Sequence, residues 1–305
     1  MVGLKQHFDS LEDAIVSFFG SNVKIARMER IFGGDINEAY GLTLTDGTNL
    51  FMKSNTGVKE SFFAAEVKGL QAIEAAGAVR TPRILCSGTD RNKTGGSFLL
   101  LEFIRKGERI SDYWETFAHQ LAAMHRAETS GFVAGGTYGF TDDNYIGMRC
   151  QCNIVHNSWI HFFRDCRLKP QLESASGYFD TTELKRADKL LERLDTVLVE
   201  PEQPSLLHGD LWSGNVITGN DGKAWLIDPA VYVGHAEADL AMTELFGGFP
   251  PAFYDAYKEA AEIQPGYAKR RDLYNLYHLL NHLNMFGRSY FPSVKRIIDY
   301  YSEAK

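Results

Sequence analysis

The stretch LHGDLWSGNV at residues 207–216, with WLIDP at residues 225–229, decides the fold and the chemistry of this chain. It supplies Asp210, then Asn215 five positions later, and Asp228 after an apolar run. A kinase uses these three kinds of side chain to hold a substrate hydroxyl and magnesium-bound ATP. Few oxygen ligands are enough, because magnesium keeps several waters and takes only one or two carboxylates together with phosphate oxygens.

The composition is that of an ordinary globular protein. The 305 residues are 44% hydrophobic and 23% charged, and this length allows one large core or two smaller ones. A formal net charge of -7 argues against a nucleic-acid partner, because such binding depends on neutralising phosphates with lysine and arginine. The one basic cluster, at residues 269–271, precedes Asp272, and we interpret it as the solvated start of a helix.

The sequence gives no sign of export or of a membrane partner. No apolar run approaches the roughly 20 residues that span a bilayer, and acidic residues stand where a signal peptide would be apolar. The four cysteines form no Cys-x-x-Cys pair, so reduced thiols are expected rather than a zinc site. We therefore expect a cytoplasmic protein, and the sequence does not indicate its oligomeric state.

The first third of the chain shows mainly strand patterns. A helical stripe over residues 4–19 ends at Gly20, and strand-like runs follow at residues 23–27, 39–44 and 49–53. These runs are short and separated by turn residues. They predict an antiparallel sheet.

The pattern then alternates between helix and strand. Asp46-Gly47 predicts a hairpin, and residues 61–76 show helical spacing. Strands are predicted at residues 83–86 and 98–103. The second of these is apolar on both faces, so we expect it inside the sheet.

Beyond this strand the chain becomes mainly helical. Helices are predicted at residues 115–128 and 182–198, and Asp180 with Glu183 forms a capping box for the second. Strands early and helices late predict an α+β protein with two lobes, hinged near residues 102–106.

We place the lobe boundary after residue 104. Residues 1–104 are the expected N-terminal nucleotide-binding lobe, with a small antiparallel sheet. Residues 105–305 are the expected C-terminal lobe, which is larger, mainly helical, and carries the catalytic and acceptor-binding residues.

Asp210 is the candidate catalytic base, which would orient the acceptor hydroxyl and take its proton. On its own, His-Gly-Asp is better explained by an aspartate that caps a helix. Asn215 and Asp228 favour the kinase interpretation, because an amide oxygen and a carboxylate can hold a metal ion between phosphates. Independent turn residues are the alternative for all three.

Lys53 and Glu66 are a second pair with an expected function. Lys53 ends a strand, from which its ammonium would reach the phosphates, and Glu66 on the next helix would fix it by an ion pair. The alternatives are an edge lysine with a solvated head group and a solvent-facing acid.

Two further segments are candidates for nucleotide binding. Gly33 and Gly34 would fold over the phosphates, although a simple hairpin turn explains them as well. Glu102, Phe103 and Ile104 would present backbone groups to an adenine edge, or form only a linker between the lobes.

Two other side chains near the motif have open interpretations. Trp212 would form a flat wall for the acceptor or would pack the loop onto the helical lobe. Asp239 opens a helix, and we expect it to accept hydrogen bonds from loop amides rather than to take part in the chemistry.

The motifs together resemble the fructosamine kinase (ketosamine-3-kinase) family. The resemblance rests on HGDLWSGN at 208–215, IDPA at 227–230 and GHAEADLAM at 234–242, with further similarity at 159–164, 167–168 and 276–281. The tryptophan in the loop separates this family from its relatives, the aminoglycoside and choline kinases. The resemblance implies a protein-kinase-like fold.

The resemblance also implies a reaction and its participants. The reaction is ATP-dependent phosphorylation of the 3-hydroxyl of a ketosamine, a sugar joined to an amine, on a small molecule or a glycated protein lysine. The product tends to lose the sugar, which frees the amine. ATP and Mg²⁺ are the implied cofactors, with Asp210 as base, Asn215 and Asp228 as metal ligands, Lys53 with Glu66 at the phosphates, and Trp212 at the sugar.

Two alternatives stay open beside this one. The same loop serves kinases for other hydroxyls, such as those of aminoglycosides or amino alcohols. A non-catalytic nucleotide-binding protein is the other alternative, although the set of Lys53, Asp210, Asn215 and Asp228 is complete here.

Overall fold

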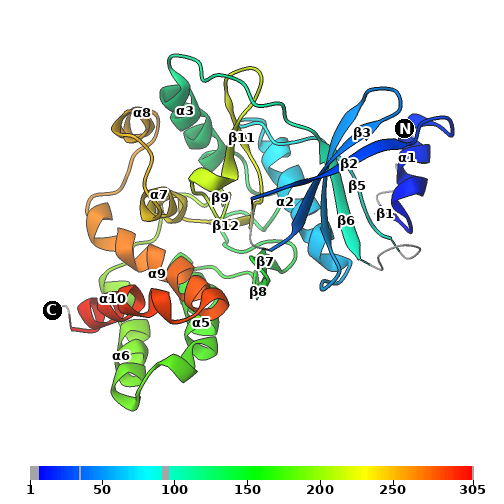
Figure 1. The fold of residues 1–305 in the computed structure, drawn as a ribbon. Helices are drawn as coiled ribbons and strands as arrows, with labels where there is room; N and C mark the ends of the chain where they lie inside the picture. The colour runs from blue at the N-terminus through cyan, green and yellow to red at the C-terminus, as the bar shows by residue number, and fades with distance from the viewer. Residues whose placement is uncertain (1–6, 34–35, 91–95, 304–305) are drawn as a thin grey trace.

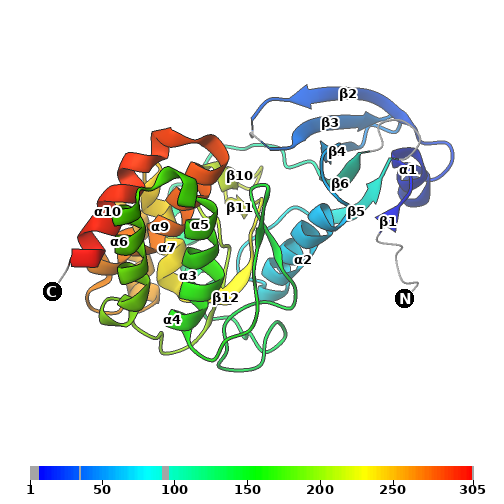
Figure 2. The same cartoon turned by 90° about the horizontal axis from the view of Figure 1, so that it is seen from below.

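The computed structural model describes residues 7–33, 36–90 and 96–303. They form two parts: a sheet with two helices, and a larger helical body that follows it in the chain (Figure 1). Figure 2 shows the sheet at one end of the molecule and the helical body at the other. The predicted α+β class, with an early antiparallel sheet and a mainly helical remainder, is confirmed.

The sheet has six strands within the described residues, in the order β1-β5-β6-β4-β3-β2. The strands are β1 (His7–Phe8), β2 (Ile25–Ile31), β3 (Glu38–Leu44), β4 (Asn49–Asn55), β5 (Ile84–Thr89) and β6 (Ser97–Glu102). The helices of this part are α1 (Leu11–Phe19) and α2 (Ser61–Ala76). β1 pairs with β5 in parallel, and the other neighbours pair antiparallel.

Strand β6 explains why the sheet carries a helix on each face. Phe98 and Leu100 belong to the buried cluster that includes α1, while Leu99 and Leu101 belong to the cluster that includes α2. Alternate side chains of a strand point to opposite faces, so an apolar run fills both clusters. The prediction of an interior strand is confirmed.

The helix predicted at residues 4–19 begins later than expected. His7 and Phe8 pair with β5 as strand β1, so the prediction is wrong for these two residues, whose backbone is satisfied by the sheet edge. Ser10 then caps α1 by accepting a hydrogen bond from the N–H of Asp13, at 3.0 Å. The first three residues of that prediction lie outside the described part of the chain.

The helical body contains the remaining helices and three short strand pairs. Its longer helices are α3 (Tyr113–His125), α6 (Thr181–Glu192), α7 (Ala236–Leu245), α8 (Pro251–Ala260), α9 (Tyr267–Phe286) and α10 (Phe291–Glu303). Shorter ones are α4 (Trp159–Phe162), a π-helical segment (Phe163–Leu168) and α5 (Lys169–Ser174), with single turns at Ser176–Tyr178, Leu194–Thr196, Ser213–Asn215 and Arg288–Tyr290. The predicted capping box of α6 is confirmed.

The short strands of the helical body hold the two motif segments at residues 207–216 and 225–229. The pairs are β9 (Ser205–Leu207) with β12 (Tyr232–Gly234), β10 (Val216–Thr218) with β11 (Ala224–Leu226), and β7 (Asn144–Ile146) with β8 (Arg149–Gln151). The turn between β9 and β10 carries Asp210 and Asn215, and the turn after β11 carries Asp228.

The hairpin of β7 and β8 is one of the places where the two parts contact each other, besides the chain segment that follows β6. The Tyr145 ring lies 4.8 Å from the Phe62 ring on α2, measured between centroids. Just before the hairpin, Asp142 forms an ion pair with Lys68 of α2 at 2.6 Å. Helix α2 therefore contacts both the sheet and the helical body.

The basic cluster at residues 269–271 differs from its prediction in one residue. Helix α9 begins at Tyr267 as expected for a helix start, but Arg270 is buried rather than solvated. Its guanidinium donates to both carboxylate oxygens of Glu237 on α7, at 2.6 and 2.7 Å. The helical period places Arg270 on the same side as the buried Tyr274, so the core face of α9 includes it.

No helix among the described residues has both the length and the apolar character that crossing a bilayer requires.

Candidate active site

The turn that carries Asp210 is built around Gly209. Its φ is +80°, a conformation that L side chains rarely adopt, and a Cβ atom there would collide with the carbonyl oxygen of Ala230. The N–H of Ala230 donates to the carbonyl of His208 at 2.9 Å, which holds the two segments together. Only glycine fits between them, so the predicted tight loop is present.

His208 is a buried, structural member of this turn. Burial lowers its pKa, so the ring is neutral at neutral pH. Its Nε2 lies 2.9 Å from the carbonyl oxygen of Ile227, and its Nδ1 lies 3.3 Å from the backbone N of Asp210. A neutral ring that donates from Nε2 and accepts at Nδ1 satisfies both contacts.

Asp239, in the first turn of α7, stabilises the turn that carries Asp210 through hydrogen bonds. Its carboxylate accepts hydrogen bonds from the backbone N–H groups of His208 at 2.7 Å and Gly209 at 2.9 Å. Its Oδ2 also lies 3.2 Å from Nε2 of His125 on α3. Burial alone would raise the pKa of Asp239, but these hydrogen bonds hold it below its usual value. The prediction that Asp239 binds loop amides is confirmed.

Asp210 and Asn215 contact each other directly. Nδ2 of Asn215 donates to the backbone oxygen of Asp210 at 2.8 Å and to its Oδ2 at 3.2 Å. The amide nitrogen thus faces Asp210, and the amide oxygen is left for another partner. Burial raises the pKa of Asp210 to about 7; the Asn215 hydrogen bond opposes this change, and the charge of Asp228 adds to it.

Lys53 on β4 lies between two carboxylates from different parts of the molecule. Its Nζ is 2.5 Å from Oε1 of Glu66 on α2 and also contacts Oδ1 of Asp228 after β11. Burial favours the neutral amine, but the charges of Asp228 and Glu66 outweigh it and raise the pKa of Lys53. The side chain is only 8% exposed, which excludes the edge-lysine alternative.

Asp228 occupies an unusual backbone conformation. Its φ of 56° lies in the left-handed region, where aspartate is one of the more tolerated residues after glycine. The turn directs its carboxylate toward Lys53 of the sheet. Lys53 thus joins Glu66 and Asp228. The N–H of Ile227 donates to the carbonyl of Asn215 at 3.1 Å, which holds the turn of Asp228 beside the turn that carries Asp210.

The segment after β6 borders a cavity. A hollow of about 310 Å³ is lined by Glu102, Phe103, Ile104, Arg105, Asn220 and Trp225. The Glu102 carboxylate accepts a hydrogen bond from the N–H of Arg83 at 3.0 Å, so its side chain fixes the start of β5. Gly33 has a φ of +133°, and Gly34 lies outside the described residues.

Trp212 lies beside the turn and is partly exposed. The residue is 37% exposed, and its ring meets Phe246, at the end of α7, edge to face at 6.1 Å between centroids. Phe246 in turn contacts His282 on α9. Both earlier interpretations of Trp212 fit this placement, because the ring both packs on the helical body and keeps an open face.

His278 is a site residue that reasoning from residue patterns missed. It lies on α9, and its Nδ1 is 3.8 Å from Oδ1 of Asp210. The sequence signal was weak, because a histidine within an apolar helical stripe is usually a core residue. Its proximity to Asp210 depends on how α9 packs beside the β9–β10 turn.

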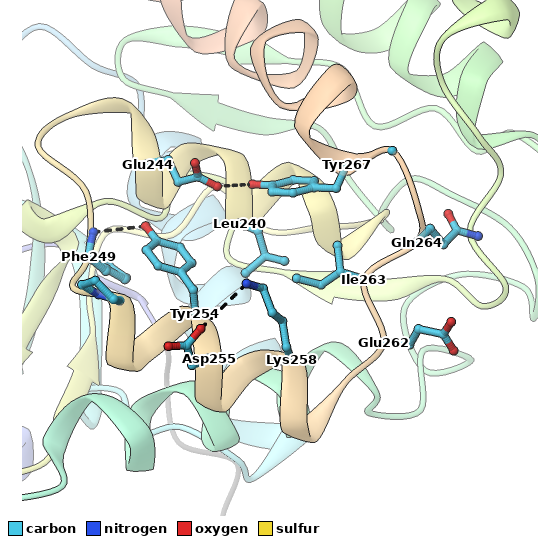
Figure 3. Close-up of a pocket in the computed structure, with 12 residues that line it drawn as sticks. Leu240, Glu244, Phe249, Tyr254, Asp255, Lys258, Glu262, Ile263, Gln264 and Tyr267 are labelled. Atoms are coloured by element: carbon cyan, nitrogen blue, oxygen red, sulfur yellow. Dashed lines mark hydrogen bonds and ion pairs between the residues drawn. The ribbon is translucent and has the colours of Figure 1, made fainter.

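A larger cavity lies elsewhere in the helical body. It measures about 720 Å³, and α7, α8 and the start of α9 surround it (Figure 3). Leu240, Phe249 and Ile263 are among its apolar lining, and Tyr267 donates to Glu244 at its edge. None of the predicted site residues lines it.

Solved structures with low sequence identity establish the fold. A crystal structure of an aminoglycoside phosphotransferase with ADP and hygromycin B superposes with a TM-score of 0.62 at 15% identity, covering 97% of this chain and 99% of that one. The fold is thus that of the protein-kinase-like phosphotransferases.

Closer relatives establish the family. The model described as fructosamine kinase matches residues 8–303. A putative fructosamine-3-kinase from Haemophilus somnus 129PT superposes with a TM-score of 0.85 at 28% identity, covering 96% of each chain. A probable ketoamine kinase from Synechocystis is 38% identical over 92% of this chain and 91% of its own length, and a chloroplastic protein-ribulosamine 3-kinase from Oryza sativa is 39% identical over 92% and 80%.

This chain belongs to the fructosamine kinase family. It is accordingly an ATP-dependent phosphotransferase that acts on a hydroxyl group.

The hydrogen bonds that Asp239 accepts predict that Asp239→Asn is less stable and less active than the wild type. An amide has one acceptor oxygen, so its NH₂ would face a buried donor, and we expect the unfolding free energy to fall by about 1–3 kcal/mol. Turnover should fall too, because the turn that carries Asp210 loses its anchor. Urea unfolding and initial rates measure the two effects.

Asp255→Asn provides the matched control. Asp255 lies on α8 with a side chain that is 73% exposed, so this change should leave both quantities near the wild-type values. An Asp239→Asn protein as stable as the wild type would contradict the structural role of Asp239.

Proposed function

We propose that this protein transfers the γ-phosphoryl group of ATP to the 3-hydroxyl of a ketosamine, either a fructosamine or a ribulosamine, free or on a protein lysine. The observation that carries the proposal is the contact of Lys53 with both Glu66 and Asp228. Asp228 lies in the turn after β11, and Asp210 contacts Asn215 in the turn between β9 and β10. The names of the relatives support the acceptor class, since they are ketoamine and ribulosamine kinases. Phosphorylation at this position would promote loss of the sugar and free the amine.

Each of these groups has a distinct role in the proposed reaction. Asp210 orients the acceptor hydroxyl and takes its proton as the bond to phosphorus forms. Lys53, held by Glu66, places its ammonium against the phosphates and lowers the cost of their charge. Most of the catalytic effect comes from positioning, because the protein makes no covalent bond to the phosphoryl group.

The donor set fits magnesium. No group of three or more His, Cys, Asp or Glu side chains in the described residues forms a metal cage. Magnesium does not need one, because it takes one or two protein ligands together with phosphate oxygens and water. Asn215 and Asp228 would be these ligands, and the bound ion would neutralise phosphate charge.

The remaining nucleotide contacts are proposed on position. Gly33 lies between β2 and β3 and would cover the phosphates with its backbone amide, and the prediction for Gly34 falls outside the described residues. Phe103 and Ile104 would present backbone groups to adenine, with the Glu102 side chain holding the start of the neighbouring strand β5. This keeps residues 1–104 as the nucleotide-binding lobe and residues 105–305 as the catalytic and acceptor-binding lobe.

The proposed setting is the cytoplasm, with ketosamine small molecules or glycated proteins as partners and no nucleic acid. The formal net charge of -7 supports the last point.

An acceptor assay tests the proposed function. ATP consumption is measured with Mg²⁺ and ribulose-lysine, fructose-lysine, kanamycin or choline as acceptor. We expect turnover with the ketosamines only, and none after Mg²⁺ is removed with a chelator. Preferential use of kanamycin or choline would reject the ketosamine assignment, and ATP binding without any turnover would indicate a non-catalytic protein.

Asp210→Asn tests the catalytic base. The substitution preserves the shape and the contact with Asn215 but removes the proton acceptor, so turnover should fall roughly 100-fold or more. ATP affinity, measured by calorimetry, should stay near the wild-type value. Near-normal turnover would reject this role, and Asp255→Asn again serves as the exposed control.

Trp212→Ala tests the acceptor wall. Loss of the exposed ring face should raise the KM for the ketosamine about tenfold and change the KM for ATP little. Trp212→Phe keeps an aromatic face, so its KM for the ketosamine should lie between those of the wild type and Trp212→Ala. If the acceptor KM does not change in Trp212→Ala, the ring serves only to pack the turn against Phe246.

A further inference from the structure

His278 has a buried polar atom with no partner, directed at the candidate base. The residue is 5% exposed, and its Nδ1 makes no hydrogen bond within the described residues. That atom lies 3.8 Å from Oδ1 of Asp210, which is too long for a hydrogen bond. A buried polar atom left unpaired costs free energy, so such an atom in a site indicates a group that a ligand completes.

The position of His278 is fixed by its neighbours on α9. Its backbone oxygen lies 2.8 Å from Nδ1 of His282, one helical turn later. The adjacent Tyr277 meets the His278 ring at 5.1 Å between centroids and donates through its hydroxyl to Gln151 of β8. The contact with the Tyr277 ring and the burial of the residue therefore restrict the imidazole to its place beside Asp210.

The ring is also kept without charge. Burial is the largest cause that lowers the pKa of His278 to about 3; the nearby His282 and Arg167 act in the same direction, and Asp239 acts in the opposite one. A cation at this place would form an ion pair with Asp210 and make that carboxylate a poorer base. A neutral imidazole instead offers one hydrogen-bonding atom to an uncharged polar group.

We propose that His278 determines acceptor specificity by binding the oxygen next to the hydroxyl that Asp210 deprotonates. Two groups 3.8 Å apart suit two oxygens on neighbouring carbons, one beside each group. The pair therefore recognises a vicinal diol. The inference rests on the proposed function, in which the 3-hydroxyl lies at Asp210.

The hydroxyl on carbon 4 is the group assigned to His278. A hydroxyl both donates and accepts, so it pairs with either tautomer of the ring, whereas the ketone on carbon 2 pairs only with a protonated Nδ1. The predicted preference is for ketosamines whose carbon 4 carries a free hydroxyl in the orientation that reaches α9.

The test combines an acceptor analogue with a substitution. Wild-type enzyme is assayed with ribulose-lysine and with its 4-deoxy analogue, and we expect kcat/KM to be about tenfold lower for the analogue. His278→Leu fills a similar volume without a polar atom. The kcat/KM of this variant for ribulose-lysine should be about tenfold below the wild-type value, and its kcat/KM for the analogue should be no lower than that.

His278→Asn separates recognition from packing. The side-chain amide of asparagine places a polar atom where Nδ1 lies, so this variant should restore part of the discrimination against the analogue. The KM for ATP and the melting temperature are measured for each variant and should stay near the wild-type values.

The outcomes distinguish the two proposals. Wild-type enzyme that uses both acceptors equally well overturns the role of His278, as does a His278→Leu protein that keeps the full penalty for the analogue. Either result leaves the ketosamine kinase assignment standing. Wild-type enzyme with no turnover of ribulose-lysine or fructose-lysine overturns both.

Discussion

The ammonium of Lys53, held between Glu66 and Asp228, is the interaction on which the site depends. A buried cation is tolerated only when opposite charges and hydrogen bonds replace its water, and here they come from α2 and from the turn after β11. The requirement for both carboxylates sets the position of the sheet relative to the catalytic turn. The charged groups of Lys53, Glu66 and Asp228 are thus already in position before a nucleotide or a metal ion would bind beside them.

A buried polar network separately stabilises the turn that carries Asp210. Asp239 replaces water for two backbone N–H groups of the turn, and His125 and Tyr257 extend the network into α3 and α8. Such networks are costly when half satisfied, so each member constrains the others. The glycine at position 209 completes the arrangement, because no side chain fits against the backbone of Ala230.

Much of this was predictable from sequence where the signal is local. The interior strand β6, the capping box at Asp180 and the amide-binding role of Asp239 follow from patterns within a few residues. Non-local contacts were not predictable. A hydrophobic stripe does not reveal that Arg270 meets Glu237 across two helices, or that His278 lies beside Asp210, because both depend on how α9 packs.

The hairpin of β7 and β8 has a mechanical consequence. Its contacts with α2 join the sheet and the helical body at a place distinct from the segment after β6. Helix α2 also meets the helical body elsewhere: Ala72 and Ile73 lie in the main buried cluster of that body, and just beyond the helix the N–H of Leu226 donates to the carbonyl of Arg80 at 2.8 Å. A contact spread along a whole helix resists rotation as well as sliding, so the sheet and the helical body should behave as closely coupled parts rather than as bodies free to swing apart.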